Sequence, residues 1–460
     1  MNHTLTLAQQ TLCNATELCP ALFECINGMC EHKSVLPLTP REILGSVLIV
    51  TLGGLANAGG MGGGFIITPI LVTIFKYDPV PAIRLVYGMI FGGAIGNFIN
   101  TAANRDPKTQ KPMINYDVSL ICIPMLLCGT TVGVIVKSWL PPIFTILSLF
   151  TLTVQVLMKL WTRAKKAYET ETQQQHDQVA AEAQARKKPV EIEMQNKAIP
   201  HYVTHRASQY AEYISVIGSP HAKFLSLEDK IQFPWKRYKE ILMLLAVVMI
   251  MLVLRGTQSI HSILGVDYCT PGYWSLYAVT LGICFYFGVR GKNLLVAEAE
   301  VREKALLAGA PLTQDLKLTP DRVTSLSTVS LLAGVLAGML GIGGGMLLGT
   351  RMIDMGLNGQ QATATSGFFI VFTSSLALFQ TLIGGELNIQ DFLYFSSLTA
   401  IGAFSVSFVL KRLVDKYKRP SIMLFALCYA IIIGVAVMPF YTIIRTMEDP
   451  KVIFGFGSLC

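Results

Sequence analysis

Long apolar stretches alternate with short polar ones along most of this chain. A helix of roughly 20 apolar residues is long enough to cross about 30 Å of hydrocarbon. The pattern predicts membrane-spanning helices at 83–101, 116–136, 139–161, 239–255, 273–290, 360–383, 390–410 and 420–441. Two further apolar segments, 43–75 and 323–356, are too long for one span and too short for two full spans.

Glycine interrupts both of these segments. Residues 59–64 read Gly-Gly-Met-Gly-Gly-Gly, and residues 341–345 read Gly-Ile-Gly-Gly-Gly, about 280 residues later. Glycine weakens a helix, and backbone groups freed inside hydrocarbon need partners in protein or water. Each segment is therefore predicted to be a helix pair, either re-entrant or made of two short spans. Paired breaks in two halves are typical of a secondary transporter's binding site; the alternative is close helix packing through small residues.

The spans between the breaks predict how the two halves are related. If each helix pair returns to its starting side, five crossings separate the breaks, which then enter the membrane from opposite faces. We therefore expect an all-α polytopic membrane protein with two inverted repeats, each a glycine-broken helix pair plus three spans, and two linking spans. The predicted divisions are a tail 1–42, a first repeat 43–161, a polar loop 162–238, linking spans 239–322, a second repeat 323–441 and a C-terminal tail 442–460.

Charge predicts the orientation. The 460 residues carry a formal net charge of +8, and the basic residues gather beside spans, in 105–111, 163–188, 290–304 and 411–419. All four groups fall on one side, which the positive-inside rule assigns to the cytosol. The N-terminus is then exterior or lumenal, in a plasma membrane or an endomembrane. The basic balance needs no nucleic-acid partner, and the expected partners are the lipid bilayer and a small anion.

The N-terminal tail is dense in cysteine, which indicates two disulfides of open connectivity if the tail is exterior. A zinc site would need closely paired Cys-x-x-Cys ligands, which the tail lacks. The tail also holds the chain's Asn-x-Ser/Thr sequons, which are glycosylation candidates. The residues concerned are Cys13, Cys19, Cys25, Cys30, Asn2 and Asn14. In the polar loop, Tyr168 to Lys197 is predicted to be helical, and no protein partner can be named for it.

The candidate chemistry lies in the spans. There is no enzyme motif and no histidine in a predicted span, so neither an enzyme nor a cofactor or metal is expected. Helices that restart after the glycines present free N–H groups and positive dipole ends, which suit an anion. Alternatively, nearby hydroxyls bond back to helix carbonyls. The candidate substrate-binding residues are Asn57, Gly62, Gly63, Gly64, Asn97, Gly343, Gly344, Gly345, Thr363, Thr365, Ser366 and Ser374.

A few charged residues lie near the apolar segments. Arg84 and Arg255 fall at predicted span ends, where long side chains reach the interface by snorkelling. Arg351 and Asp354 follow the second break and, three residues apart on a helix, are expected to pair with each other. The alternative is that Arg351 attracts an anion.

The glycine motifs carry a resemblance. Residues 57–69, together with 338–346, 361–366 and 372–375, resemble the two signatures of the sulfite exporter TauE/SafE family, and Pro234–Trp235, Cys269 and Tyr273–Trp274 are similar to its eukaryotic, plant-type branch. The resemblance spans roughly residues 40–440, excluding most of 165–230. It implies an all-helical exporter of small sulfur-containing anions such as sulfite or sulfonates.

Three functions compete. The leading hypothesis is a secondary transporter that exports a small sulfur-containing oxyanion by alternating access. The alternatives are a non-transporting membrane receptor or scaffold, which would use the cysteine-rich tail and the polar loop, and an anion channel. The paired glycine breaks favour transport, because a scaffold has no need of two opposed helix breaks near the middle of the membrane.

Overall fold

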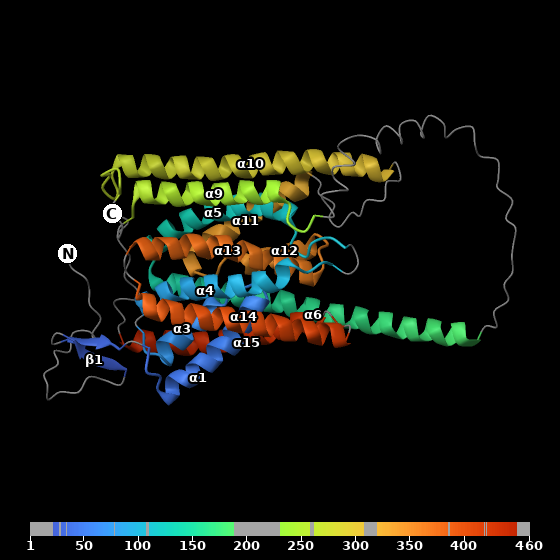
Figure 1. The fold of residues 1–460 in the computed structure, drawn as a ribbon, viewed down its shortest axis with the longest axis horizontal. Helices are drawn as coiled ribbons and strands as arrows, with labels where there is room; N and C mark the ends of the chain where they lie inside the picture. Colours follow the sequence, from blue (N-terminus) through green and yellow to red (C-terminus); the bar gives the residue numbers. More distant parts are fainter. Residues whose placement is uncertain are drawn as a thin grey trace.

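A computed structural model describes residues 22–187, 231–307 and 320–448, apart from 27–28, 34, 78, 107–109, 258–261, 385–386, 418 and 420. Most of the described chain is helical, and the long helices lie side by side in one bundle (Figure 1). Seven described helices are long and apolar enough to cross a membrane. The predicted class, an all-α polytopic membrane protein, is confirmed.

The first half begins with three consecutive helical segments, α1 (Pro40–Leu48), the π-helical η1 (Ile49–Gly53) and α2 (Gly54–Ala58). After the glycine break come α3 (Gly64–Thr73), α4 (Pro79–Ala102), α5 (Tyr116–Trp139) and α6 (Pro142–Lys187). The helix α6 continues from the span into the polar loop, which confirms the helix predicted from Tyr168 as far as Lys187. Residues 188–197 lie outside the described chain.

The linking helices are α9 (Trp235–Arg255) and α10 (Pro271–Leu307). The second half comprises α11 (Pro320–Leu340), α12 (Gly345–Asp354), α13 (Gly359–Ile383), α14 (Ile389–Tyr417) and α15 (Ser421–Glu448). Each of the eight predicted spans coincides with one long helix, to within a few residues at its start. Both glycine-broken segments form the predicted helix pairs.

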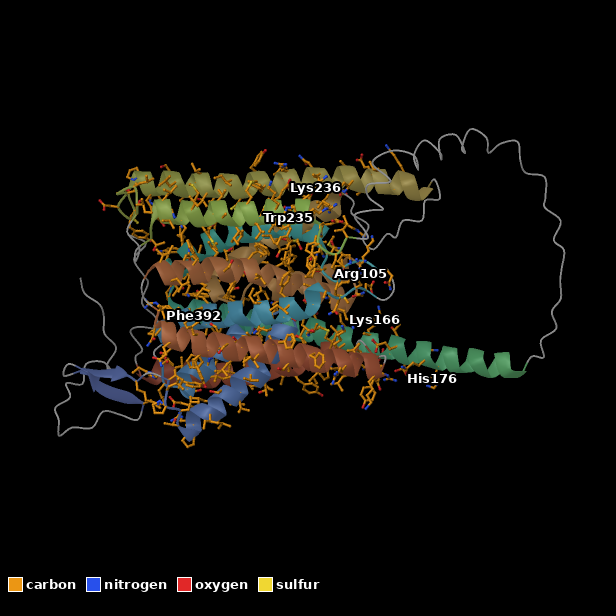
Figure 2. The ribbon with its side chains drawn as sticks, in the orientation of Figure 1. Arg105, Lys166, His176, Trp235, Lys236 and Phe392 are labelled. Carbon is orange, nitrogen blue, oxygen red and sulfur yellow. The ribbon has the colours of Figure 1, made fainter. Side chains whose placement is uncertain are left out.

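The basic loops meet at one end of the bundle. Lys411 Nζ donates to Asn104 Oδ1 at 2.6 Å, and Arg290 pairs with Glu240 at 3.1 Å. Figure 2 shows Arg105 and Lys166 at this end and Phe392 at the other. We call the end that carries the basic loops the inner end, and the opposite end the outer end.

A two-stranded hairpin, which the sequence analysis did not predict, lies at the outer end (Figure 1). Strand β1 (Phe23–Ile26) pairs antiparallel with β2 (Met29–His32), and Cys25 lies opposite Cys30. An Asn-Gly dipeptide at 27–28 separates the strands in the sequence, and this is a strong hairpin signal. Cys13, Cys19 and both sequons lie outside the described residues, so the tail disulfides and glycosylation stay predictions.

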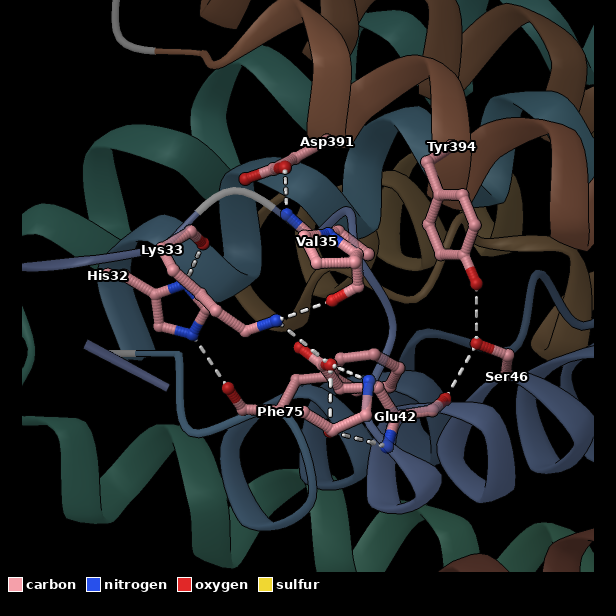
Figure 3. A network of polar contacts seen from close by, with 10 residues as sticks. His32, Lys33, Val35, Glu42, Ser46, Phe75, Asp391 and Tyr394 are labelled. Atoms are coloured by element: carbon pink, nitrogen blue, oxygen red, sulfur yellow. Dashed lines mark hydrogen bonds and ion pairs between the residues drawn. The ribbon is translucent and has the colours of Figure 1, made fainter. Parts of the chain in front are cut away.

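Polar contacts attach the hairpin to the outer ends of α1 and α3 (Figure 3). One ring nitrogen of His32, Nε2, lies 2.7 Å from the Phe75 carbonyl oxygen after α3. Lys33 pairs at 3.1 Å with the buried carboxylate of Glu42 in α1. Glu42 also completes a capping box with Thr39, so the same carboxylate stabilises the start of the helix.

A second contact joins this region to the other half of the chain. Asp391, buried at the start of α14, accepts from the Val35 amide at 3.3 Å and from the Tyr77 hydroxyl at 2.7 Å. Burial, together with the negative charge of Asp391, raises the pKa of Tyr77 above its ordinary value. Tyr77 therefore remains a hydroxyl donor across the physiological pH range.

Glycine brings the backbones of α5 and α11 into contact. A Cβ atom added at Gly129 or Gly133 would lie 2.2 or 2.1 Å from a carbonyl oxygen of α11. A Cβ added at Gly334 or Gly338 would lie 2.4 Å from a carbonyl oxygen of α5 in each case. Each helix thus presents a Gly-x-x-x-Gly stripe to the other, which is a common way for membrane helices to approach closely.

A second pair of helices, one from each half, approaches in the same way. A Cβ added at Gly54 in α2 would lie 2.6 Å from the Gly402 carbonyl oxygen in α14, and one at Gly402 would lie 2.4 Å from that of Val50. Helix α14 also touches α4, where a Cβ at Gly92 or Gly96 would lie 2.4 or 2.3 Å from a carbonyl oxygen. Each half thus packs a glycine-bearing helix of its broken pair against a long helix of the other.

Replacing Gly133 by alanine should separate α5 from α11, because the added methyl group meets the Val335 carbonyl oxygen. We expect a loss of about 1–3 kcal/mol in unfolding free energy, seen as a lower melting temperature in detergent. The matched control is Gly282→Ala in α10, where a Cβ would find no atom within 4 Å. Equal melting temperatures for the two variants would contradict this account of the packing.

Candidate functional site

The two glycine breaks have the same backbone conformation. Three glycines in each break adopt the left-handed region, in matching order. Their φ angles are 71°, 81° and 72° for Gly60, Gly62 and Gly63, and 71°, 74° and 72° for Gly341, Gly343 and Gly344. Residues that carry a Cβ rarely adopt this backbone conformation. The three glycines in each break therefore allow the chain to reverse its direction sharply.

Each break ends at the start of a short helix. Gly63 is the N-cap of α3 and Gly344 is the N-cap of α12, and neither supplies a side-chain cap. The first backbone bonds of α3 run from the Ile66 and Ile67 amides to the Gly63 carbonyl. This leaves the amides of the first turn outside the helical ladder, as the geometry of a helix N-terminus requires.

The two breaks touch each other reciprocally. A Cβ added at Gly64 would lie 2.7 Å from the Gly341 carbonyl oxygen, and one added at Gly345 would lie 2.6 Å from the Gly60 carbonyl oxygen. Gly64 and Gly345 are the first residues of α3 and α12, so equivalent positions of the two halves exchange equivalent contacts. The chain therefore brings two helix N-termini together at the centre of the bundle.

An outer pocket lies on one side of the breaks. It has a volume of about 530 Å³, which includes the open space at its mouth. It is lined by α4, by the outer parts of α5 and α13, and by the second break. Its polar lining consists of hydroxyl and amide groups, and none of its lining side chains is acidic. These polar residues are Tyr87, Thr130, Thr131, Thr373, Ser374 and Gln380.

An inner pocket lies on the other side. It has a volume of about 370 Å³, which again includes the open space at its mouth. It is lined by the first break, by α6 and α12, and by the inner ends of α13 and α15. Thr350, Thr363 and Ser366 contribute its polar side chains, again without an acidic group. The Ser366 hydroxyl is buried and has no hydrogen-bond partner in the described structure, so it is available to a ligand.

A layer of isoleucine separates the two pockets. A Cβ at Gly343, in the outer pocket, would lie 3.2 Å from Ile370, and one at Gly345, in the inner pocket, would lie 3.0 Å from the same side chain. A Cβ at Gly62 would lie 3.3 Å from the Ile90 side chain and 3.6 Å from that of Ile370, and both isoleucines are buried. The side chains that lie between the two pockets at this point are therefore apolar.

The structure divides the candidate residues from the sequence into three groups. Gly343 and Ser374 line the outer pocket. Gly345, Thr363 and Ser366 line the inner pocket. The remaining candidates line neither pocket: Asn57, Gly62, Gly63, Gly64, Asn97, Gly344 and Thr365.

The polar members of this last group bond within the helix bundle. Asn57 Nδ2 donates to the Gly53 carbonyl at 2.9 Å, and Asn97 Nδ2 donates to the Asn57 carbonyl at 3.2 Å. The Thr365 hydroxyl donates to the Gln361 carbonyl at 2.7 Å and accepts from the Asn115 amide at 3.0 Å. These bonds correspond to the alternative weighed from the sequence, in which polar groups bond to helix backbones.

Sequence reasoning did not identify several residues that line the pockets. Tyr87, Thr130, Thr131 and Gln380 line the outer pocket, and Thr350 lines the inner one. None of them lies within a glycine motif. Only their appearance as isolated polar residues in apolar spans could have drawn attention to them.

A cation lies behind the wall of each pocket. Lys137 Nζ donates to the Tyr87 hydroxyl at 3.5 Å, and Tyr87 lines the outer pocket. Arg163 donates to the Thr350 carbonyl at 2.7 Å, and Thr350 lines the inner pocket. Each cation is thus one residue away from the space where a ligand would bind.

Two expectations about charged residues were wrong. Asp354 pairs with Arg163 of α6, while Arg351 donates to the Ser325 hydroxyl at 2.8 Å, because the end of α12 packs beside α6 and the start of α11. Arg255 does not snorkel to water. It is only 6% exposed, because tyrosines of α10 cover it.

The bundle and its paired, glycine-broken halves define a polytopic membrane protein of transporter type. The chain belongs to the sulfite exporter TauE/SafE family, which matches residues 43–192 and 231–437. This confirms the resemblance seen in the glycine motifs. The family is one of membrane transporters and not of enzymes.

Relatives occur in Arabidopsis thaliana. Sulfite exporter TauE/SafE family protein 3 is 23% identical over 432 residues, covering 91% of this chain and 82% of that protein. Family protein 5 is 23% identical over 392 residues, covering 85% of this chain and 81% of that protein. These similarities agree with the plant-type branch. No solved structure matches the chain.

Replacing Gly341 tests whether the breaks depend on left-handed backbone. A Cβ there would approach only the Tyr87 ring, at 3.7 Å, so the cost of substitution is conformational. Gly341→Val should lower stability by roughly 1–2 kcal/mol and reduce transport, whereas Gly341→Asn should be better tolerated because asparagine enters this region more readily. Melting temperature and flux are the measurements, and indistinguishable variants would argue against a conformational requirement.

Proposed function

We propose that this protein is a secondary transporter that exports a small sulfur-containing oxyanion, sulfite or an organosulfonate, by alternating access. One observation carries the proposal. The outer pocket reaches the second glycine break and the inner pocket reaches the first, the two breaks touch each other, and the side chains of Ile90 and Ile370 lie between the pockets. Alternating access requires one central site that opens to one side at a time.

An inverted relation between the halves supports this mechanism. The first helix pair has its free ends at the outer end, where Arg41 of α1 donates to the Thr73 carbonyl of α3 at 2.7 Å. The second pair has its free ends at the inner end, where Arg351 of α12 meets Ser325 of α11. Two halves of opposite orientation can exchange conformations, so that the closed side becomes the open one.

The chemistry of the pockets favours an anion. Hydroxyls and amides can donate to an oxyanion, acidic side chains are missing from both linings, and the N-termini of α3 and α12 add their positive dipole ends. In our proposal the backbone of Gly343 and Gly345 and the hydroxyls of Thr363, Ser366 and Ser374 contact the substrate. Asn57, Asn97 and Thr365 hold the surrounding backbone in place.

The substrate class comes from the relatives. The Arabidopsis proteins carry the name sulfite exporter TauE/SafE family protein, and an oxyanion suits the polarity of these pockets. The two other functions fit less well. An anion channel needs a continuous polar path, which the isoleucine layer interrupts, and a receptor or scaffold gives no reason for two pockets at one pair of breaks. Saturable counterflow of labelled sulfite in proteoliposomes is the experiment that separates carrier from channel.

The unpartnered Ser366 hydroxyl gives a residue-level test. Ser366→Ala should raise the KM for sulfite from the inner side by about 2- to 12-fold, the equivalent of one neutral hydrogen bond of 0.5–1.5 kcal/mol. The matched control is Ser375→Ala on the same helix, because Ser375 bonds the Phe372 carbonyl at 2.8 Å and lines neither pocket. Equal KM values for the two variants would remove Ser366 from the site.

The same proposal fixes an orientation, with the outer end facing the exterior or a lumen. Cys269, in the loop before α10, is disulfide-bonded, and disulfides persist in oxidising compartments. If the tail is exterior, glycosidase treatment should increase the electrophoretic mobility of the wild type and leave an Asn2→Gln/Asn14→Gln double variant unchanged. Labelling of a tag at residue 5 from the cytosolic side would overturn this orientation.

A further inference from the structure

Arg255 ends α9 at the outer end of the bundle, and it is a buried cation without an anionic partner among the described residues. Its side chain is 6% exposed, and the nitrogens Nε and Nη1 are fully buried without a hydrogen-bond acceptor in the described chain. No described carboxylate forms an ion pair with it, and the next acidic residue along the chain is Asp267, in the loop before α10. A buried charge of this kind is costly unless something compensates it.

Tyrosine rings cover the guanidinium but do not satisfy its donors. Its central carbon lies 5.3 Å from the centroid of the Tyr273 ring and 4.8 Å from that of Tyr277. A cation–π contact uses the flat face of the guanidinium, while its N–H groups point outward in the plane. The rings therefore hold the group in position while the Nε and Nη1 donors remain without an acceptor among the described residues.

The surroundings add further anion-binding features. Tyr273 and Tyr277 belong to the first two turns of α10, which begins at Pro271, so the positive end of that helix dipole lies beside Arg255. Tyr268 packs against Tyr273 with ring centroids 4.9 Å apart, which brings a third phenol to the same region. A helix N-terminus and a buried, unpartnered guanidinium are two independent features that favour an anion.

This region also adjoins the outer pocket. The Tyr277 hydroxyl interacts with the Thr131 side chain, and Thr131 lines the pocket. Arg255 itself lines neither pocket, so it belongs to a separate position between the outer pocket and the loop before α10.

We propose that Arg255, with Tyr273 and Tyr277, forms a binding site for an oxyanion at the outer end of the molecule. The guanidinium donates N–H bonds to two oxygens of the anion, and the phenols hold the guanidinium between them. A free sulfate or sulfite and the phosphate of a lipid headgroup share this chemistry. The site does not depend on the proposed transport mechanism, since binding is measured without flux.

The test uses the full-length protein and three substitutions. Arg255→Met removes the donors while keeping apolar bulk, and Arg255→Lys keeps the charge but loses the forked donors. Arg290→Gln is the matched control, because Arg290 is an exposed arginine of α10 that pairs with Glu240. Melting temperature and gel filtration establish that each variant is folded, and the lysine variant serves if the methionine variant does not fold.

Two arms separate the sources of the anion. In detergent, equilibrium binding of radiolabelled sulfate should weaken about tenfold or more in Arg255→Met and by a smaller factor in Arg255→Lys, with Arg290→Gln like the wild type. In nanodiscs, a lipid ligand would instead give the wild type a higher melting temperature in phosphatidylglycerol than in phosphatidylcholine, and Arg255→Met would lose this difference. Either result supports the site, and it shows whether the bound anion is a free oxyanion or a lipid phosphate.

The proposal is overturned if folded Arg255 variants match the wild type in both arms. Sulfite flux of the wild type is recorded in parallel, so that the two proposals fail separately. Binding at Arg255 without any flux would leave this site standing and reject the transport function. Sulfite flux in the wild type, together with unchanged anion binding in the Arg255 variants, would support the transport function and reject the Arg255 site.

Discussion

Direct contact between helix backbones at glycine is the constraint on which this structure depends. Lipid tails are as apolar as leucine, so burial of apolar side chains gives little drive for membrane helices to associate. Here α5 and α11 approach until a Cβ at Gly133 would lie 2.1 Å from a carbonyl oxygen, and α14 meets α2 and α4 in the same way. These contacts join each half of the chain to the other. The central position of the glycine breaks follows from them.

Glycine has a second, different role within the breaks. There it supplies left-handed backbone, at Gly60, Gly62 and Gly63 and again at Gly341, Gly343 and Gly344. The chain can therefore reverse direction inside the bundle and start a new helix. The same glycines let the two breaks touch, with Ile370 spanning the space between the pockets. Close packing and a ligand site were rival explanations of these motifs. The structure shows the close packing, and it also places Gly60, Gly343 and Gly345 in the linings of the two pockets.

The sequence was a reliable guide to whatever depends on hydropathy and backbone chemistry. The spans, the two helix pairs and the special role of the glycines could all be predicted, because each leaves a local pattern. The direction of a polar side chain leaves no such pattern. Thr365 and Ser366 are adjacent in α13, yet one bonds the Asn115 amide and the other faces the inner pocket with a free hydroxyl. The burial of Arg255 was not predicted for a related reason. Whether a residue at the end of a span reaches water depends on its neighbours on another helix, here the tyrosines of α10.

The placement of cations explains how such a site could bind an anion and still release it. An arginine inside a dry pocket would hold an oxyanion through strong, charge-assisted bonds, and a transporter must let its substrate go. Lys137 lies behind Tyr87, and Arg163 lies behind the Thr350 carbonyl with its charge paired to Asp354. Lys137 thus adds positive potential to the outer pocket, whose polar lining consists of neutral hydroxyls and amides. Because the potential acts over a longer range than a hydrogen bond, it can attract an anion without holding it in an ion pair.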